Sequence, residues 1–428
     1  MEKYVVKKLE NKKSITVDVP GSKSITNRAL LLAAMGTKKC RLRGVLFSED
    51  SRAFLSCIKE LGFDLTIDEK NKTVEVQGTG GKIKNNTATI NVMSAGTAAR
   101  FLTVFLAVAG GDYVLNSSEQ MKRRPMAELI DALRNLGVDI KCLESEGHFP
   151  FELHSEGLKK SEVTIDTTRS SQYASALMMA AAISDGMTIT MTGDRTEGAY
   201  IKITSTMMKQ FGVSFEKNGN VCTVKPDAFG IEEYLIEPDA SAACYFYAMA
   251  PVLKIKTKVN NLFFNSMQGD MKFVRVMEKI GCRVTETENG IEIDGTQLKD
   301  YNGVDVVMKD FSDQTMTMAV VAAFAKTKTI IRNIGHIRLQ ESDRVSAIAN
   351  ELTKMGCKVE ILEDNGQTDI CIEPGTIVPC EIDTYEDHRM AMSFTIPGLA
   401  VDGFIINNPL CCRKTFENYY DIIDEITK

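Results

Sequence analysis

Leu136-Gly137-Val138-Asp139-Ile140 is the stretch of sequence that decides the fold, because similar stretches recur along the whole chain. Each one follows a helical pattern and precedes an alternating strand, a polar turn and a second strand. The others are residues 61–65, 211–215, 280–284 and 355–359, and the five glycines are spaced 75, 75, 69 and 75 residues apart. A glycine just past a helix is the usual left-handed C-cap, and a fixed period of this length indicates a repeat architecture.

The polar turns in three of these repeats carry a hairpin signal. They are Asn218-Gly219, Asn289-Gly290 and Asn365-Gly366. An Asn-Gly pair between two alternating strands is typical of a tight β-hairpin. Helices and strands therefore alternate within every repeat, which predicts an α/β fold.

A second set of landmarks keeps the same period. Six segments rich in Ala and Met each begin at a small polar residue that can cap a helix: Ser24, Ser94, Ser170, Asp239, Asp313 and Asp387. The segments that follow, such as residues 101–109, 174–183 and 316–325, are apolar on nearly every face. A helix that is apolar all round must be buried. Each repeat should therefore place one helix inside, with a second helix and the strands outside it.

The two ends of the chain are expected to complete the repeat pattern. Residues 416–426 form a sixth outer helix that no strands follow, and residues 4–19 read as two strands joined by a polar turn at residues 10–13. We expect both head strands to complete the last unit. Six units of about 70–75 residues would then form two domains, residues 21–238 and residues 1–20 plus 239–428, with a hinge near Pro20 and Pro238 and a cleft that closes.

Composition narrows the class of protein. The chain has 428 residues, is 44% hydrophobic and 25% charged, and carries a formal net charge of −6, with no basic run that would suggest nucleic-acid binding. Its apolar runs are too short to span a membrane, and its start is too polar for a secretory segment. The 11 cysteines form no C-x-x-C pair, and the 4 histidines lack zinc-site spacing. We expect a cytoplasmic monomer that binds neither nucleic acid nor membrane.

Basic residues recur near the predicted starts of the buried helices. They are Lys23, Arg28, Arg100, Arg124, Arg344, Arg389 and Lys414. A helix N-terminus carries a partial positive charge and free N–H donors, so helix starts that gather on one face can bind anions. The pattern predicts a site for a polyanionic, phosphorylated substrate.

The residues at these helix starts form a distinctive series. In chain order they are Pro20-Gly21-Ser22-Lys23-Ser24-Ile25-Thr26-Asn27-Arg28, Ala95-Gly96-Thr97-Ala98-Ala99-Arg100, Arg124-Pro125-Met126, Ser170-Ser171-Gln172-Tyr173, Asn265-Ser266-Met267-Gln268-Gly269-Asp270, Glu341-Ser342-Asp343-Arg344, Asp387-His388-Arg389-Met390 and Lys414-Thr415-Phe416. In order and spacing, over essentially the whole chain, this series resembles the 5-enolpyruvylshikimate-3-phosphate synthase family of enolpyruvyl transferases.

The resemblance implies a fold and a reaction. The fold is an inside-out α/β barrel with two domains of three βαβαββ units each. The reaction transfers the enolpyruvyl group of phosphoenolpyruvate to the 5-hydroxyl of shikimate 3-phosphate and releases phosphate, by addition and elimination through a tetrahedral intermediate. This step belongs to the shikimate pathway of aromatic amino-acid biosynthesis. The family uses no metal or organic cofactor, so none is expected.

The resemblance also implies roles for individual residues. Lys23, Gly96, Arg124, Gln172, Arg344, Arg389 and Lys414 would bind phosphoenolpyruvate. Lys23, Ser24, Arg28, Ser170, Ser171, Gln172, Tyr200, Asp313, His336 and Gln340 would bind shikimate 3-phosphate. Asp313 would take the hydroxyl proton, Glu341 would give and take the proton at C3, and Lys23 would neutralise the leaving phosphate.

Four positions depart from the family's usual residues. Gln340 stands where Lys is common, His336 where Asn is frequent, Ser94 where Asn precedes the Ala-Gly pair, and Glu197 near a usual Ser. Ser94 is still expected to cap its helix, and Glu197 to point away because a carboxylate would repel phosphate. Arg338 or Lys309 could offset the charge that Gln340 lacks.

Two other functions remain open at this stage. A UDP-N-acetylglucosamine enolpyruvyl transferase shares the fold but typically uses a loop cysteine, and residues 117–125 contain none. A non-catalytic phosphometabolite-binding homologue is the second alternative, and Gln340 is the residue that encourages it.

Overall fold

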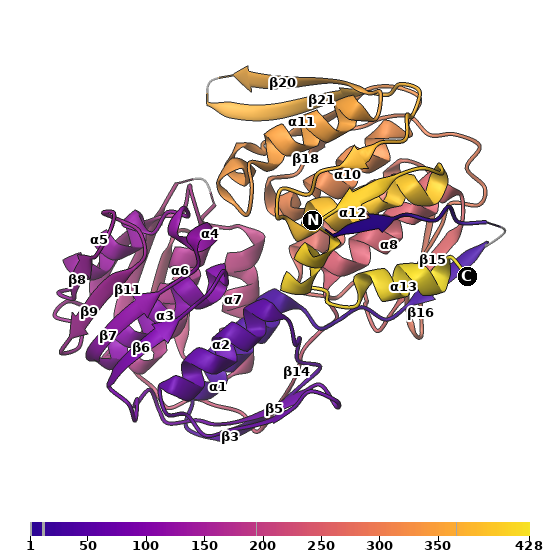
Figure 1. Ribbon diagram of the computed structural model, residues 1–428. Coiled ribbons are helices and arrows are strands. Elements are labelled where there is room, and N and C mark those ends of the chain that lie inside the picture. The colour runs from indigo at the N-terminus through magenta and orange to yellow at the C-terminus, as the bar shows by residue number, and fades with distance from the viewer. Residues whose placement is uncertain (1, 11–12, 194, 365) are drawn as a thin grey trace. The chain divides into compact units, whose positions relative to one another are not determined.

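The computed structural model describes residues 2–10, 13–193, 195–364 and 366–428 (Figure 1). The chain divides into two compact units. We call Gly21–Ile236 the N-terminal unit, and Glu237–Lys428 together with the segment that ends at Pro20 the C-terminal unit.

Three four-stranded sheets form the N-terminal unit. Their strand orders are β14(Glu233–Leu235)-β3(Lys39–Arg43)-β5(Thr73–Gln77)-β4(Leu65–Asp68), β6(Thr87–Asn91)-β7(Gly111–Asn116)-β9(Phe151–Ser155)-β8(Asp139–Cys142) and β10(Glu162–Asp166)-β11(Met187–Thr192)-β13(Val221–Val224)-β12(Phe215–Asn218). In each sheet the first pair of strands is parallel and the other two pairs are antiparallel.

Three buried helices form the interior of this unit. They are α1 (Lys23–Met35), α3 (Gly96–Ala109) and α6 (Ser171–Ala180), which continues into the 3-10 turn η1 (Ala181–Ile183). Helix α3 packs against both α1 and α6. The amphipathic helices α2 (Glu49–Glu60), α5 (Ala127–Asn135) and α7 (Ala199–Gln210), and the short α4 (Glu119–Lys122), bury only part of their surface. The interior helices are those that the sequence predicts to be apolar all round.

The C-terminal unit repeats this arrangement. Its sheets are β2(Ser14–Val17)-β15(Lys256–Asn260)-β17(Gly290–Asp294)-β16(Arg283–Thr287), β18(Asp305–Val307)-β19(Thr329–Arg332)-β21(Gln367–Glu373)-β20(Lys358–Asp364) and β22(Glu381–Ile382)-β23(Ile405–Asn407)-β1(Lys3–Val5). The interior helices α8 (Ala240–Leu253), α10 (Thr315–Ala323) and α12 (His388–Ala400) pack against one another (Figure 1).

Outer helices and short 3-10 turns complete this unit. They are α9 (Lys272–Lys279), α11 (Arg344–Lys354), α13 (Tyr419–Ile426), η2 (Gly269–Met271), η3 (Lys309–Gln314), η4 (Gly335–Leu339) and η5 (Pro409–Lys414). The described strands of the whole chain thus form six small sheets, three in each unit, and the predicted α/β class is confirmed.

One prediction about the chain ends is wrong. Both head strands were expected to complete the last unit, but only β1 joins that sheet, beside β23. Strand β2 instead pairs in parallel with β15 and opens the fourth sheet. The chain leaves the last sheet after the backbone bonds of Val6 to Phe404 and Leu9 to Leu399, and the buried Ile15 and Val17 then fill the edge beside β15.

The repeat glycines have the predicted conformation. Gly62, Gly137, Gly212, Gly281 and Gly356 have φ between +84° and +106°. Their conformation confirms the left-handed caps, which cost little only for glycine. The Asn218-Gly219 and Asn289-Gly290 turns join strands as expected. Asn365 of the third turn, and Asn11 and Lys12 of the predicted head turn, lie outside the described residues.

Half of the predicted helix caps are confirmed. Ser170, Asp239 and Asp387 accept hydrogen bonds from the backbone N–H groups of the first turn. Ser24, Ser94 and Asp313 do not act as caps: Ser22 precedes α1, Ala95 precedes α3, and Gln314 precedes α10. The Ser94 hydroxyl bonds to Ser118 at 2.6 Å instead, and the Asp313 carboxylate is bound by arginine side chains.

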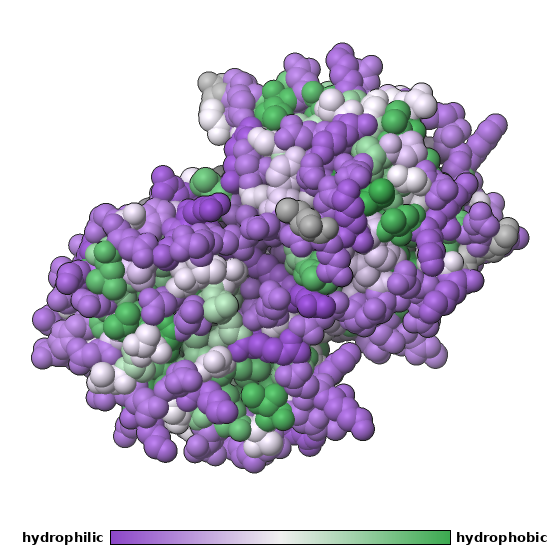
Figure 2. All heavy atoms as spheres, in the orientation of Figure 1, coloured by the Kyte–Doolittle hydropathy of each residue, from purple (hydrophilic) through white to green (hydrophobic). Residues whose placement is uncertain are grey.

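No helix among the described residues is long and apolar enough to cross a membrane. Figure 2 shows hydrophilic residues over most of the face that it draws, with hydrophobic residues in small separate groups. Large side chains such as Val5, Leu235 and Val307 are exposed singly, which is ordinary for a protein surface.

Two of the repeat glycines offer a matched test of the architecture. A Cβ atom on Gly356 would lie 2.4 Å from the Thr376 carbonyl oxygen, whereas one on Gly212 meets nothing within 4 Å. We expect Gly212→Ala to cost about 1–2 kcal/mol for its left-handed backbone, and Gly356→Ala to cost about 1–3 kcal/mol more for the clash. Urea unfolding of both variants measures the difference, and equal losses would contradict the expectation.

Candidate active site

In the N-terminal unit, side chains tie the starts of the interior helices together. Asn27 Nδ2 on α1 donates to Thr97 Oγ1 on α3 at 2.5 Å. The carbonyl oxygen of Pro125 accepts from Tyr173 on α6 at 2.7 Å and from Arg100 on α3 at 3.1 Å. The predicted gathering of helix starts is therefore present in this unit, and the loop that carries Arg124 is anchored to it.

Gly96 allows two guanidinium groups to approach the start of α3. A Cβ atom at this position would lie 2.6 Å from Arg124 Nη1 and 2.9 Å from Arg100 Nη1. Any larger residue would displace these groups. The free N–H donors of the helix start and two cations thus share one place, which is the combination that binds phosphate.

Lys23 lies in the first turn of α1 beside a buried acid. Its Nζ is 3.3 Å from Asp50 Oδ2, and the exposed fractions of the two side chains are 16% and 4%. The pairing fixes the position of the ammonium group. Asp50 on α2 is a site neighbour that sequence reasoning missed, because a single acid within a helix carries no signal of its own.

Arg28, a predicted substrate-binding residue, is deeply buried. It is 1% exposed, and its guanidinium donates to Thr204 Oγ1 and to the Ser24 carbonyl oxygen, each at 2.8 Å. It also lies over the rings of Phe101 and Tyr200. Burial lowers the pKa of Arg28 to about 10. These contacts join α1 to α3 and α7, and direct substrate contact by Arg28 stays a prediction.

The start of α6 supplies polar groups of the predicted kind. Ser170 caps the helix, Ser171 is buried in its first turn, and the Oε1 atom of Gln172 is buried with no hydrogen-bond partner among the described residues. A buried acceptor that lacks a donor costs free energy unless a ligand or water supplies one. The predicted role of Gln172 in substrate binding is compatible with this arrangement and stays a prediction.

In the C-terminal unit, Arg344 lies at the centre of a charged cluster. Its Nε is 2.8 Å from Asp387 Oδ2, its Nη1 is 3.1 Å from Asp313 Oδ1, and its Nη2 is 2.9 Å from Glu341 Oε2. Gln340 also accepts a hydrogen bond from it. Although burial lowers the pKa of Arg344, the carboxylates of Asp387, Glu341 and Asp313 raise it above its ordinary value.

Two further cations complete this cluster. Arg389 Nη2 is 2.9 Å from Asp313 Oδ2, and Lys414 Nζ is 3.8 Å from Glu341 Oε1. Both oxygens of Asp313 are therefore bound by arginine, one by Arg344 and the other by Arg389. We define the reaction cluster as Arg344, Arg389, Lys414, Asp313, Glu341 and Asp387. Three cations and three carboxylates make it close to neutral while it is buried.

The structure places all six of these residues together, although they come from two separate repeats, the fifth and the sixth. Five of the six were predicted from the sequence as site residues. Asp387 was predicted only as a helix cap, and it does cap α12 by accepting from the Arg389 N–H at 2.9 Å. Its pairing with Arg344 was missed, since that contact joins parts of the chain 43 residues apart.

The remaining departures from the family pattern also have positions. His336 Nε2 lies 2.7 Å from Ser312 Oγ. Glu197 forms an ion pair with Lys217, and its orientation relative to a bound phosphate stays a prediction. Arg338 forms ion pairs with Asp343 and Glu363. Because these carboxylates neutralise its charge, Arg338 does not replace a lysine at position 340.

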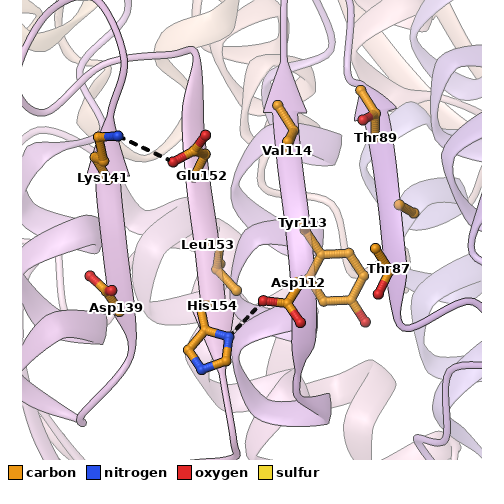
Figure 3. Close-up of a pocket in the computed structure, with 11 residues that line it drawn as sticks. Thr87, Thr89, Asp112, Tyr113, Val114, Asp139, Lys141, Glu152, Leu153 and His154 are labelled. Carbon is orange, nitrogen blue, oxygen red and sulfur yellow. Dashed lines mark hydrogen bonds and ion pairs between the residues drawn. The ribbon is translucent and has the colours of Figure 1, made fainter.

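A separate depression of about 500 Å³ lies on the exposed face of the β6-β7-β9-β8 sheet (Figure 3). Its floor carries cross-strand pairs, His154 with Asp112 at 2.7 Å and Lys141 with Glu152 at 3.6 Å. The hydrogen bond that His154 donates to the Asp112 carboxylate raises the pKa of His154. No predicted site residue lines the depression, and such pairs are ordinary on a solvated sheet.

The comparisons with known proteins identify the family of this chain. A family model described as EPSP synthase (3-phosphoshikimate 1-carboxyvinyltransferase) matches residues 8–423. Among curated proteins, the 3-phosphoshikimate 1-carboxyvinyltransferase of Trichormus variabilis is 38% identical over 98% of both chains. The protein of that name from Vibrio atlanticus is 39% identical over 95% of both chains.

A solved structure extends the likeness to the fold. The EPSP synthase from Acinetobacter baumannii superposes with a TM-score of 0.82 at 22% identity, covering 100% of this chain and 98% of its own. The repeated α/β units and the matched family and relatives, all named as carboxyvinyltransferases, define the protein as a transferase. Within that class, this chain belongs to the EPSP synthase family.

The contact between Gly96 and Arg124 leads to a binding test. Gly96→Ala places a Cβ atom 2.6 Å from Arg124 Nη1, so the guanidinium must move away from the start of α3. We expect the variant to bind phosphoenolpyruvate about tenfold more weakly, a loss of about 1.4 kcal/mol, when titrated calorimetrically. Thermal unfolding should change little, because only the ends of two long side chains, those of Arg124 and Arg100, shift. Unaltered binding would show that Arg124 does not meet the ligand at this helix start.

Proposed function

We propose that this chain is a 3-phosphoshikimate 1-carboxyvinyltransferase. It transfers the enolpyruvyl group of phosphoenolpyruvate to the 5-hydroxyl of shikimate 3-phosphate, and phosphate is the other product. Family membership supports the reaction. The structural observation that carries the proposal is the reaction cluster, in which Asp313 lies between two guanidinium groups and Glu341 lies between Arg344 and Lys414.

The addition step needs two proton transfers, for which the cluster has two acids. Asp313 takes the proton of the 5-hydroxyl as its oxygen attacks C2 of phosphoenolpyruvate. Glu341, in its protonated form, gives a proton to C3. The product is a tetrahedral intermediate that still carries the phosphate and now has a methyl group.

The elimination step reverses the transfer at carbon. Glu341 removes a proton from the methyl group while the bond between C2 and the phosphate oxygen breaks. Lys23, whose position is fixed by Asp50, neutralises the charge that develops on the leaving phosphate. The leaving phosphate takes up the proton that Asp313 accepted from the hydroxyl, so Asp313 returns to a carboxylate, Glu341 returns to its acid form, and atoms and charges balance.

The cluster also explains how substrate could activate its base. Contacts with Arg344 and Arg389 hold Asp313 as a carboxylate, which makes it a weak base. The phosphate and carboxylate of phosphoenolpyruvate compete for the same guanidinium groups. When the anions take over those bonds, Asp313 loses its stabilising contacts and accepts a proton more readily.

The remaining assignments follow from the same proposal. Gln172, Arg124, Gly96, Lys23, Arg344, Arg389 and Lys414 bind phosphoenolpyruvate. Ser24, Arg28, Ser170, Ser171, Tyr200, His336 and Gln340 bind shikimate 3-phosphate, together with Lys23, Gln172 and Asp313. Two domains joined by a hinge near Pro20 and Pro238, a working monomer and a cytoplasmic location complete the proposal.

Phosphate release tests the reaction directly. We expect release when both substrates are present and none when either is omitted, which separates a catalyst from a non-catalytic binder. Asp313→Asn and Glu341→Gln should each lower kcat by about 10²–10⁴-fold, because each removes a proton-transfer group. Asp343→Asn is the matched control: it lies in the same loop, and Asn caps a helix as well as Asp does. Full activity in Asp313→Asn would exclude it as the base.

Position 340 tests the departure from the family pattern. We expect Gln340→Lys to lower the Michaelis constant for shikimate 3-phosphate, because an ammonium group attracts its phosphate. Lysine cannot accept the hydrogen bond that Arg344 now donates to Gln340. The Michaelis constant for phosphoenolpyruvate should therefore rise. Steady-state kinetics with each substrate varied in turn measure both, and an unchanged constant for shikimate 3-phosphate would mean that another cation already fills that place.

A further inference from the structure

A fourth carboxylate, that of Asp270, adjoins the reaction cluster and is linked to Arg389 through Ser241. Asp270 is on η2 and is only 7% exposed. Its Oδ2 accepts hydrogen bonds from the hydroxyl of Ser241 and from Nε2 of Gln314, the latter at 3.1 Å. It belongs to the Gln268-Gly269-Asp270 string, to which the proposed reaction gives no task.

The two donors link Asp270 to the base of the reaction. The Ser241 hydroxyl donates its hydrogen bond to Asp270. Its oxygen can therefore accept a hydrogen bond from Arg389 Nη2, at 3.4 Å. The same Nη2 atom donates to Asp313 Oδ2 at 2.9 Å. A continuous series of hydrogen bonds therefore runs from Asp270 through Ser241 and Arg389 to Asp313.

The second donor is fixed in orientation as well. Gln314 is fully buried and follows Asp313 directly in the chain. Its amide oxygen accepts from Thr317 Oγ1 at 3.1 Å, so its amide nitrogen must point to Asp270. Asp270 thus binds the side chain of Gln314, the residue next to Asp313, and contacts the guanidinium of Arg389 through Ser241.

Charge supplies a third link. Burial and the charge of Asp313 together raise the pKa of Asp270 to about 6, although Arg389 and the hydrogen bonds from Ser241 and Gln314 lower it. The elements packed around η2 carry Cys244 on α8, Lys272 on α9, Lys309, Asp310 and Asp313 on η3, and Arg389 on α12. Of these, Lys272 is paired with Asp310 at 2.5 Å. Asp270 and Asp313 are therefore two buried acids that share one guanidinium, that of Arg389.

We propose that Asp270 is a positioning residue for the enolpyruvyl transfer: through Ser241 it orients Arg389, and by its negative charge it makes Asp313 a better proton acceptor. This inference rests on the proposed function, in which Asp313 is the base. Two carboxylates that share a site oppose each other's ionisation, so a charged Asp270 favours the protonated form of Asp313. Asp270 does this without touching the substrate.

The kinetic test compares four proteins in the phosphate-release assay between pH 5 and 9. We expect Asp270→Asn to lower kcat by about tenfold and to move the acid limb of the pH–rate profile to lower pH by about half a unit or more. Ser241→Ala should raise the Michaelis constant for phosphoenolpyruvate and leave the acid limb in place. Asp310→Asn removes an equal charge from the neighbouring exposed pair and should match wild type.

A second measurement does not depend on turnover. The raised pKa means that Asp270 stabilises the folded state below its unfolded value near 3.8 and loses this contribution as pH rises through about 6. The melting temperature of Asp270→Asn minus that of wild type should therefore be higher at pH 8 than at pH 5. In a double-mutant cycle with Asp313→Asn, the two shifts should be non-additive by about 2–4 °C at pH 8 and nearly additive at pH 5.

The outcomes are distinct. An acid limb that does not move in Asp270→Asn, a limb that moves equally in Asp310→Asn, or additive melting shifts at pH 8 would each overturn the proposal. If wild type releases no phosphate from the two substrates together, the proposed function fails. The melting cycle would then still decide whether Asp270 and Asp313 are coupled.

Discussion

The ion pairs of one buried guanidinium, that of Arg344, hold the C-terminal site together. Its three nitrogens each meet a carboxylate, and these come from the end of η3, the loop before α11 and the cap of α12. Removing one partner of such a buried pair typically costs about 3–5 kcal/mol. The contacts that place the acids of the reaction therefore also join two repeats, the fifth and the sixth. The same side chains must both maintain the fold and yield to an anionic substrate.

The N-terminal unit meets the same requirement with different chemistry. Its helix starts are joined by hydroxyl, amide and carbonyl groups, such as the bonds to the Pro125 carbonyl oxygen, while Arg100 and Arg124 lie beside Gly96 and Lys23 pairs with Asp50. Arg28 is buried among hydroxyls and aromatic rings, so its role includes packing. In the C-terminal unit, arginine and lysine side chains are paired with carboxylates. In the N-terminal unit, Arg124 lies at the start of α3, where Gly96 has no side chain to displace it.

The local sequence predicts much of the fold because the same pattern of helix, glycine and strands recurs in each repeat. Five glycines past five helices, each with a left-handed backbone, follow from spacing alone. The head strand β2 could not be assigned in this way, since pairing with β15 depends on which sheet edge is open and on no local pattern. Ser94 and Asp313 were predicted as caps for a similar reason: a small polar residue before an apolar helix fits the pattern whether or not its side chain turns toward the helix.

The sequence by itself determined the α/β class, the six repeats, the buried helices and most of the charged residues of the site, because these depend on residue type and spacing. Only the tertiary structure decided which charges meet. The bonds of Arg344 to Asp313 and Asp387 span 31 and 43 residues, and the link from Asp270 to Asp313 passes through Ser241 and Arg389 from two other helices. Such contacts arise when separate helix starts are buried together, where an unpaired charge is too costly to remain and each group must find its partner in space.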